Sequence, residues 1–375
     1  QRVLVFCDTW GSKHGMATLN MALCAGLAQA GHEVFVLVQR QDEAEVPSGV
    51  TVIGPRHGRP VTLADLPDSV DLVIGHGHEG GMAAVYAVEQ RYRDAKCVHL
   101  LHLLPMTTFT LAEDPDEARL WLAAQIFVAR RADLVAGVGP VLAAEALESS
   151  SMAGRASIHE LAPMLTMAKQ PPRPKPGAPE RVLLFGRIDD PLKGAEVAAH
   201  MVRQRRDRGH DTRLVVLGGD PQTLEEAHAK LAKLVGDSEA VEVLAYTSNP
   251  EQLQKKIRKA TVVIMPSRVE SFGLVATEAI EQGVPVIVPA SSGAGRFLAG
   301  LSRYRKKAER FNLVEHHVGA PQSIDAWAER LDVVLDDLPA AWTNARRLQK
   351  RLSSFTAQRS AQRLVDAALN APPPP

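Results

Sequence analysis

The sequence predicts an α/β protein with two doubly wound, Rossmann-like domains. Three observations predict this class. Short apolar runs alternate with helical patterns, the alternation restarts after a proline-rich stretch at 169–180, and 375 residues exceed what one ordinary core holds. Apolar strands that alternate with helices are typical of a parallel sheet covered on both faces.

The first half of the chain contains six apolar runs that predict buried strands. They cover residues 3–6, 33–38, 50–53, 70–75, 96–104 and 134–138. Helical patterns occupy residues 18–30, 80–91 and 114–132. Gly31 follows the first helix, as glycine commonly does at helix ends. We expect these elements to form a first domain of residues 1–168.

The second half repeats the pattern after the proline-rich segment 169–180, which composition marks as an interdomain linker. Strands are predicted at residues 182–185, 213–217, 241–245, 261–265 and 284–288, with helices at 196–208 and 223–235 among them. These elements predict a second domain of residues 181–338, followed by a C-terminal helix at 339–370. The proline-rich tail 371–375 reads as the beginning of a linker.

Composition excludes several classes of function. The chain carries 43 basic and 43 acidic residues, so no nucleic-acid partner is indicated. Its three cysteines, at positions 7, 24 and 97, form no metal pattern and indicate a reducing, cytoplasmic compartment. No apolar run reaches the roughly 20 residues of a membrane span, although contact with a membrane surface stays open. The lack of an initial Met and the proline tail suggest a part of a longer polypeptide.

The most informative stretch is 262–289, V-V-I-M-P-S-R-V-E-S-F-G-L-V-A-T-E-A-I-E-Q-G-V-P-V-I-V-P. It predicts a strand, a polar loop, a helix and a second strand. Glu270 lies in the loop and Glu278, eight positions later, lies on the helix. Free backbone N–H groups are expected at the helix start, on Phe272, Gly273 and Leu274. The unit would gather carboxylate acceptors and N–H donors around one cavity.

This stretch resembles the nucleotide-sugar site of retaining glycosyltransferases of the GT-B fold, in the family 4 type (glycosyl transferases group 1). That family includes sucrose, trehalose, mannosyl and glycogen synthases. The resemblance rests on P-S-x-x-E-S-F-G-L-x-x-x-E and the following G-x-P-V-I. It implies two domains facing across a cleft, a last helix that crosses back to the first domain, a nucleotide-diphosphate sugar as donor, and no metal or cofactor. Two Glu residues eight apart on a solvated helix are the alternative explanation.

Two cations of the second domain complete the predicted donor site. Gly186-Arg187-x5-Lys193-Gly194 is similar to the family's G-R-x5-K-G segment. The Arg187 fork and the Lys193 point charge are both suited to phosphate oxygens, although solvated surface cations are the alternative. The resemblance implies that Glu270 binds hydroxyls of the donor sugar and that Glu278 binds the two ribose hydroxyls. It also implies front-face retention, in which the leaving diphosphate accepts the acceptor's proton.

The first domain offers a glycine loop and several histidines. The loop 11–15, which ends at Gly15, resembles the family's glycine-rich loop near the diphosphate, and it is not a G-x-G-x-x-G fingerprint. His102 matches the histidine that contacts the donor sugar near the reacting carbon, with packing in the core as the alternative. His76, His78 and His99 also follow or lie in strands. No carboxylate or thiol stands near His76 and His78 in sequence to complete a zinc site.

Three positions depart from the family pattern. Ser271 stands where glycine is commoner, Leu103 replaces an Asp, and residues 294–297 lack a common Glu. The leading hypothesis is a retaining glycosyltransferase that moves a sugar from a nucleotide-diphosphate sugar to an unknown acceptor. The alternative is a non-catalytic nucleotide-sugar-binding module, for sensing or interaction, within a larger multidomain protein. The Glu270 and Glu278 pattern disfavours an epimerase or a phosphorylase.

Overall fold

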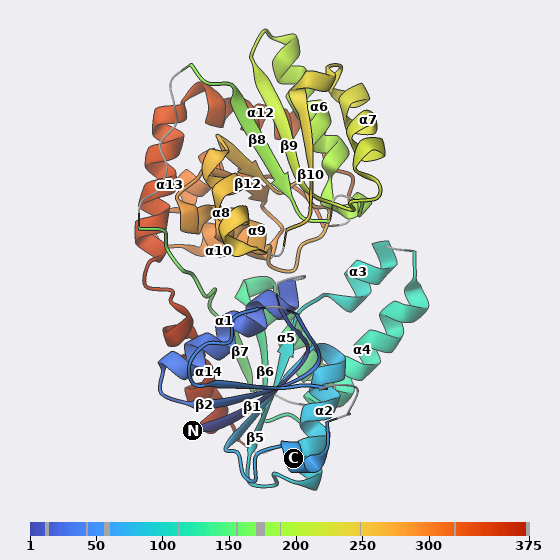
Figure 1. The fold of residues 1–375 in the computed structure, drawn as a ribbon, viewed down its shortest axis with the longest axis vertical. Coiled ribbons are helices and arrows are strands. Elements are labelled where there is room, and N and C mark those ends of the chain that lie inside the picture. Colours follow the sequence, from blue (N-terminus) through green and yellow to red (C-terminus); the bar gives the residue numbers. More distant parts are fainter. Residues whose placement is uncertain are drawn as a thin grey trace. The chain divides into compact units, whose positions relative to one another are not determined.

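The computed structural model of the chain contains two α/β units, each built on one parallel sheet (Figure 1). The first unit comprises Gln1–Met164 and Ser354–Pro375, and the second comprises Leu165–Ser353. The structure describes residues 1–11, 15–42, 44–55, 61–111, 113–154, 157–169, 177–187, 189–247, 249–318 and 320–372. Both sheets are doubly wound, which confirms the predicted fold class.

The first unit holds a seven-stranded sheet with the order β3-β2-β1-β4-β5-β6-β7. Its strands are β1 (Arg2–Trp10), β2 (Glu33–Gln41), β3 (Val50–Ile53), β4 (Leu72–His76), β5 (Lys96–Leu101), β6 (Leu134–Val138) and β7 (Ile158–Leu161). Its helices are α1 (Gly15–Gln29), η1 (Leu63–Asp65), α2 (Gly77–Gln90), α3 (Pro105–Leu111), α4 (Pro115–Ala129), α5 (Gly139–Met152) and α14 (Ala357–Leu369).

The strand order explains why helices cover both faces of this sheet. From β1 the chain moves outward to β2 through α1, whereas from β4 it moves the opposite way to β5 through α2. Right-handed crossovers in opposite directions place α1 and α2 on opposite faces. Leu4, Phe6 and Val73 pack with Val85 of α2 and Val128 of α4 on one face. The point where the direction reverses, between β1 and β4, is where ligands bind in such sheets.

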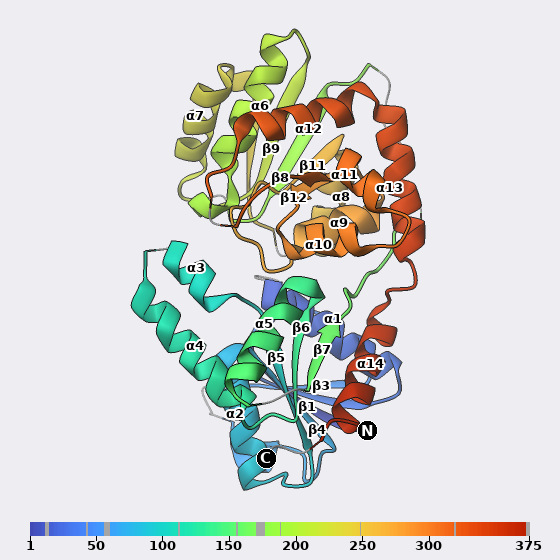
Figure 2. The same cartoon turned by 180° about the vertical axis from the view of Figure 1, so that it is seen from behind.

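Helix α14 returns to the first unit and lies against α1, as both views show (Figures 1 and 2). The two helices approach so closely that a Cβ added to Gly26 would lie 2.4 Å from the Ala357 carbonyl oxygen. Gln358 also donates its side-chain N–H to the Gln29 carbonyl at 2.9 Å. Glycine at position 26 is therefore required by this contact rather than by backbone conformation.

The second unit holds a six-stranded sheet with the order β10-β9-β8-β11-β12-β13. Its strands are β8 (Glu180–Phe185), β9 (Thr212–Gly219), β10 (Val241–Ala245), β11 (Val262–Ile264), β12 (Val286–Pro289) and β13 (Leu313–Val314). Its helices are η2 (Pro191–Lys193), α6 (Ala195–Asp207), α7 (Leu224–Val235), η3 (Ser238–Ala240), α8 (Pro250–Lys259), α9 (Leu274–Gln282), α10 (Gly293–Gly300), α11 (Arg305–Phe311), α12 (Ile324–Asp336) and α13 (Leu338–Leu352).

Helix α6 of this unit is anchored by a buried arginine. The Arg205 guanidinium, whose side chain is 2% exposed, donates to Glu180 of β8 at 2.7 and 2.9 Å. It also donates to Asp332 at 3.0 Å and to Asp336 at 2.6 Å, both on α12. A buried cation with several carboxylate partners resists displacement, because removing a partner leaves charge uncompensated. The network fixes α6 against the sheet, and so fixes the loop that precedes it.

Most predicted elements differ from the structure by a few residues at their ends, and two differences each add a helix. The strand predicted at 96–104 ends at Leu101, and a separate helix, α3, begins at Pro105. The single helix predicted at 339–370 is two helices, α13 and α14, because Thr356 begins a new one by accepting from the Arg359 N–H at 3.3 Å. Residues 170–176 of the predicted linker and 373–375 of the tail lie outside the described residues.

Candidate functional site

The strand order of the second unit brings two loops of the predicted site together. Strands β8 and β11 are hydrogen-bonded neighbours at the point where the winding of this sheet reverses. The segment 186–194 follows β8, and the segment 265–273 follows β11. Both leave the carboxyl edge of the sheet, where open α/β sheets bind ligands. The candidate site therefore lies where the topology favours one.

Lys193 and Glu270 meet at this edge although 77 positions separate them. The Lys193 ammonium donates to Glu270 Oε2 at 2.8 Å, and the side chains are 25% and 19% exposed. Arg187 does not join this pair. Its guanidinium binds Asp190 at 3.2 Å and its side chain is 82% exposed. The structure thus brings together one predicted cation and one predicted carboxylate, while the second cation stands in solvent nearby in the same loop.

The two loops are held in register by backbone contacts. The Arg268 N–H donates to the Leu192 carbonyl at 2.8 Å. Gly194 has a φ of 75° and approaches Pro266 so closely that an added Cβ would lie 2.2 Å from the Pro266 carbonyl oxygen. Only glycine meets both requirements at position 194. The position of the neighbouring Lys193 is consequently set by main-chain packing.

The loop that carries Glu270 leads into an open helix start. Gly273 has a φ of 98° and precedes α9 without any side-chain cap, so the first N–H groups of the helix depend on other partners. The Gly293 N–H of α10 donates to the Glu270 carbonyl at 3.2 Å, and the Ala294 N–H donates to the Phe272 carbonyl at 2.7 Å. The start of α10, where the family's Glu is missing, thus supports the loop that carries Glu270. A helix start of this kind attracts anions.

Glu278 lies one turn into α9 and is half-buried. Burial, with a smaller contribution from the Glu281 charge, raises its pKa to about 8. Burial also raises the pKa of Glu281 to about 7, against the effect of the Thr166 N–H, which donates to that carboxylate at 2.7 Å. A protonated carboxyl can donate one hydrogen bond as well as accept others. Glu278 is therefore equipped for hydroxyl groups in either protonation state.

These two carboxyls predict that the chain loses stability as pH rises. The folded chain keeps both protons above the ordinary pKa of 4.5, at which the unfolded chain releases them. The free energy of unfolding should therefore fall between about pH 5 and pH 8, by at most about 1.4 kcal/mol per pH unit for each group. Urea unfolding across this range should show a shallower fall for Glu278→Gln, while Glu251→Gln, an exposed control on α8, keeps the wild-type slope.

The first unit carries the predicted histidines at the ends of β4 and β5. His102 is half-buried, and its Nε2 lies 2.9 Å from Nδ1 of the buried His76. The rings stack with 5.0 Å between centroids. Burial, followed by the charge of His102, lowers the pKa of His76, and burial lowers the pKa of His99 to about 3. His78 instead contacts Trp121, with 3.9 Å between ring centroids and the ring planes tilted by 52°. The contact between His76 and His102 was not predicted from the sequence.

The remaining predicted residue of the first unit is Gly15. It begins α1 and is exposed. Residues 12–14 of its glycine loop lie outside the described residues. Among the residues that the structure does describe, no group of three or more His, Cys, Asp or Glu side chains is arranged to hold a metal ion.

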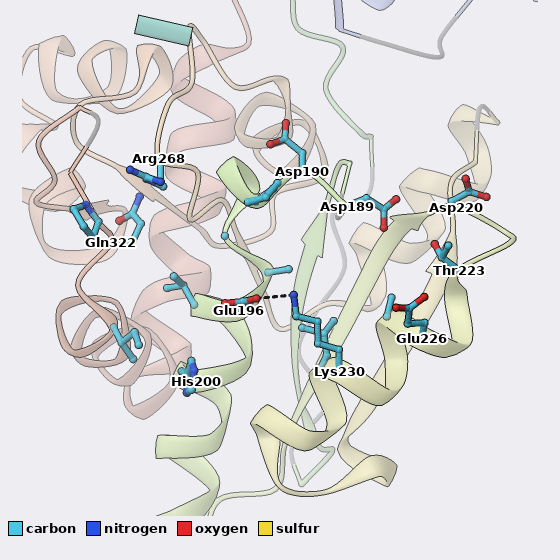
Figure 3. A pocket seen from close by; sticks show the side chains of 18 residues that line it. Asp189, Asp190, Glu196, His200, Asp220, Thr223, Glu226, Lys230, Arg268 and Gln322 are labelled. Atoms are coloured by element: carbon cyan, nitrogen blue, oxygen red, sulfur yellow. Dashed lines mark ion pairs between the residues drawn. The ribbon is translucent and has the colours of Figure 1, made fainter. Parts of the chain in front are cut away.

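A cavity of about 800 Å³ lies beside the site, and sequence analysis did not predict it (Figure 3). Asp220, Thr223 and Glu226 line one side of it and Arg268 and Gln322 the other. Five carboxylates border it, from Asp189, Asp190, Glu196, Asp220 and Glu226. Because these outnumber the cations, the cavity is poorly suited to a diphosphate. Gly194 of the G-R-x5-K-G segment lines it, whereas none of the side chains predicted to bind the donor does.

Comparison with known proteins places the chain in a family. The model of the family described as "Family 4 Glycosyltransferase in conflict systems" matches residues 4–364, nearly the whole chain. The chain belongs to this family 4 of glycosyltransferases. The family suggested by the Glu270 and Glu278 motif is thereby confirmed.

Proteins of similar sequence are also named as glycosyltransferases. A D-inositol 3-phosphate glycosyltransferase of Corynebacterium efficiens is 34% identical to this glycosyltransferase-family chain over 160 residues, covering 42% of this chain and 34% of that protein. The match thus spans about a third of that relative's length. A protein of the same name from Jonesia denitrificans is 29% identical over 377 residues, covering 87% of this chain and 84% of that protein.

Solved structures share the fold of this family 4 chain. A sucrose-phosphate synthase from Thermosynechococcus elongatus has a TM-score of 0.76 at 20% identity and covers 98% of both chains. Anabaena HepE in complex with UDP-glucose has a TM-score of 0.69 at 16% identity, covering 97% of this chain and 98% of that one. At these identities the likeness establishes the GT-B fold alone.

The described residues of this family member contain no helix with the length and apolarity of a membrane-spanning segment.

Proposed function

We propose that the chain is a retaining glycosyltransferase that moves a sugar from a nucleotide-diphosphate sugar to an acceptor. The observation that carries this proposal is the close pair of Lys193 and Glu270 at the reversal point of the second sheet. The uncapped start of α9 follows in the same loop. A cation and a helix start suit a diphosphate, and a carboxylate suits sugar hydroxyls.

The pair implies an exchange of partners when the donor binds. Lys193 Nζ now neutralises Glu270, with both side chains three-quarters or more buried. A diphosphate would compete for the ammonium, and sugar hydroxyls would replace it on the carboxylate. Charge that develops on the leaving diphosphate would then be stabilised by Lys193 and by the α9 N–H groups. Arg187 pairs with Asp190 and is largely exposed, so a change of rotamer would let its guanidinium make a bidentate contact with the diphosphate.

Retention follows from the same arrangement in this proposal. In the proposed donor complex hydroxyls of the donor sugar occupy Glu270, so this carboxylate would not serve as the general base. The leaving diphosphate would take the acceptor's proton on the face from which it departs. Glu278 would bind the ribose hydroxyls, and His102 would contact the donor sugar. No metal or cofactor is needed for these steps.

Nucleotide sugars are supported as donors by the fold relatives. Anabaena HepE was solved in complex with UDP-glucose. A second structure is described as "Trehalose-6-phosphate from E. coli bound with UDP-2-fluoro glucose". Three free, buried cysteines support the proposal of a reducing compartment, because buried thiols of this kind need no oxidising environment.

The function is tested by incubating the chain with UDP-, GDP- and ADP-sugars and measuring release of the nucleoside diphosphate. In calorimetry with the preferred nucleotide, Glu278→Ala should bind about 10-fold more weakly, since two hydrogen bonds of about 0.5–1.5 kcal/mol each are lost. Glu251→Ala on α8 is the matched exposed control. Unchanged affinity in Glu278→Ala would place the ribose elsewhere.

A non-catalytic nucleotide-sugar-binding module is the second candidate. It is favoured by the lack of the family's Glu in residues 294–297. These residues lie in α10, which supports the Glu270 loop through backbone hydrogen bonds and supplies no carboxylate there. Tight binding without diphosphate release, across all donors and a broad set of acceptors, would support this candidate over transfer.

A further inference from the structure

His76 and His102 of the first unit form a hydrogen bond in which one ring must donate and the other accept. Strands β4 and β5 pair in parallel with His76 opposite Leu100. Residue 102 lies two positions beyond Leu100, which brings its ring over that of His76. His76 Nδ1 and His102 Nε2 are 2.9 Å apart, and the ring planes differ by 15°. Between two neutral imidazoles, one of these nitrogens must donate and the other accept.

Burial decides which nitrogen donates. His76 is 2% exposed, and its Nε2 is buried without a hydrogen-bond partner among the described atoms. If the His76 proton were on Nε2, a buried N–H would be left unpaired, which is rare and costly in proteins. A proton on Nδ1 instead has an acceptor, the Nε2 lone pair of His102. The environment therefore favours His76 as the donor.

We propose that His76 is a positioning residue, which donates from Nδ1 to Nε2 of His102 and so fixes the tautomer and ring orientation of His102. With its Nε2 accepting, His102 carries its own proton on Nδ1. That N–H is then the group that His102 presents as a donor to an oxygen of the donor sugar. The inference deepens the proposed function, on which the sugar contact of His102 rests.

The tautomers are tested directly by long-range ¹H–¹⁵N NMR of the whole chain with labelled histidine. In the wild type we expect both His76 and His102 to carry the proton on Nδ1. In His76→Phe, which keeps a stacked ring without a donor, the His102 nitrogens should shift toward averaged values. His76→Asn should restore the wild-type pattern, because the Asn side-chain N–H group occupies the place of Nδ1. A wild-type His102 protonated on Nε2 would overturn the proposal.

Kinetics provide the second readout, with UDP-glucose or whichever donor of the panel is turned over. His76→Phe should lower kcat about 10- to 100-fold, as small misplacements of a contacting group do, with little change in KM for the donor. His76→Asn should recover most of that loss. Equal damage in Phe and Asn variants that melt within a few degrees of the wild type would show a purely structural role and refute positioning.

His99 supplies the matched control for loss of a buried imidazole. It is fully buried in β5, and neither of its ring nitrogens bonds His102. His99→Leu should change the melting temperature but keep the His102 tautomer. If the wild type releases no diphosphate from any donor, the proposed transfer fails, and the NMR pattern still decides the positioning role of His76.

Discussion

Lys193→Ala should lower kcat for sugar transfer about 100- to 1000-fold, a loss of about 3–4 kcal/mol of transition-state stabilisation. The reason is the position of Lys193, whose side chain is 25% exposed and whose ammonium lies 2.8 Å from Glu270 Oε2 at the carboxyl edge of the sheet. A charge in such a partly desolvated place acts on a leaving diphosphate more strongly than a solvated one. Single-turnover measurements with saturating donor would isolate this step.

The variant also leaves Glu270 without its partner, so a second substitution separates the two effects. Lys193→Ala combined with Glu270→Gln should regain stability lost in the single variant, and its transfer rate should stay low. Arg305→Ala is the control, because Arg305 pairs with Glu309 at 2.9 Å on the exposed surface of α11, and its removal should leave kcat within about two-fold. Wild-type rates in Lys193→Ala would show that the diphosphate is bound elsewhere.

Gly194→Ala should both destabilise the second unit and reduce transfer at least 10-fold. An alanine Cβ would lie 2.2 Å from the Pro266 carbonyl oxygen, and the φ of 75° adds about 1–2 kcal/mol of strain. The β8 and β11 loops would have to separate, which displaces the neighbouring Lys193 from Glu270. Thermal unfolding and kcat measured on the same preparation check both effects.

Gly209→Ala isolates the strain from the steric clash. Gly209 has a φ of 89°, and an added Cβ there meets no atom within 4 Å. Its variant should lose only the strain energy of about 1–2 kcal/mol and keep its transfer rate. If Gly194→Ala were as mild as Gly209→Ala, the close packing of the two loops would not determine where Lys193 lies.

Much of the fold was predictable because its strands are short, apolar and regularly spaced. The strand predicted at 241–245 matches β10. The break between α13 and α14 was missed because a helical pattern continues across Ser353 and Ser354. Thr356, a common first residue before a helix, was the available signal. Strand β13, at two residues, is too short for periodicity to detect.

The site was predictable in part for a different reason. Lys193 and Glu270 were identified by motif, and neighbouring strands bring motifs together at one edge. The ion pair between them does not follow from either motif, since it depends on side-chain rotamers, which the spacing of residues does not determine. The contact of His76 with His102 needs the register of β4 and β5, which sequence alone leaves open. The cavity lined by five carboxylates arises where packed side chains leave space, and the spacing of residues along the sequence does not predict where that happens.

The return of α14 to the first unit has a consequence for the order of folding during synthesis. Gly26 is shaped to receive Ala357, a residue that the ribosome adds more than 300 positions later. Every residue of the second unit, up to Ser353, is made before that helix exists. The second unit can therefore complete its core before the first unit does. Until α14 is synthesised, the surface of α1 that it packs against stays uncovered.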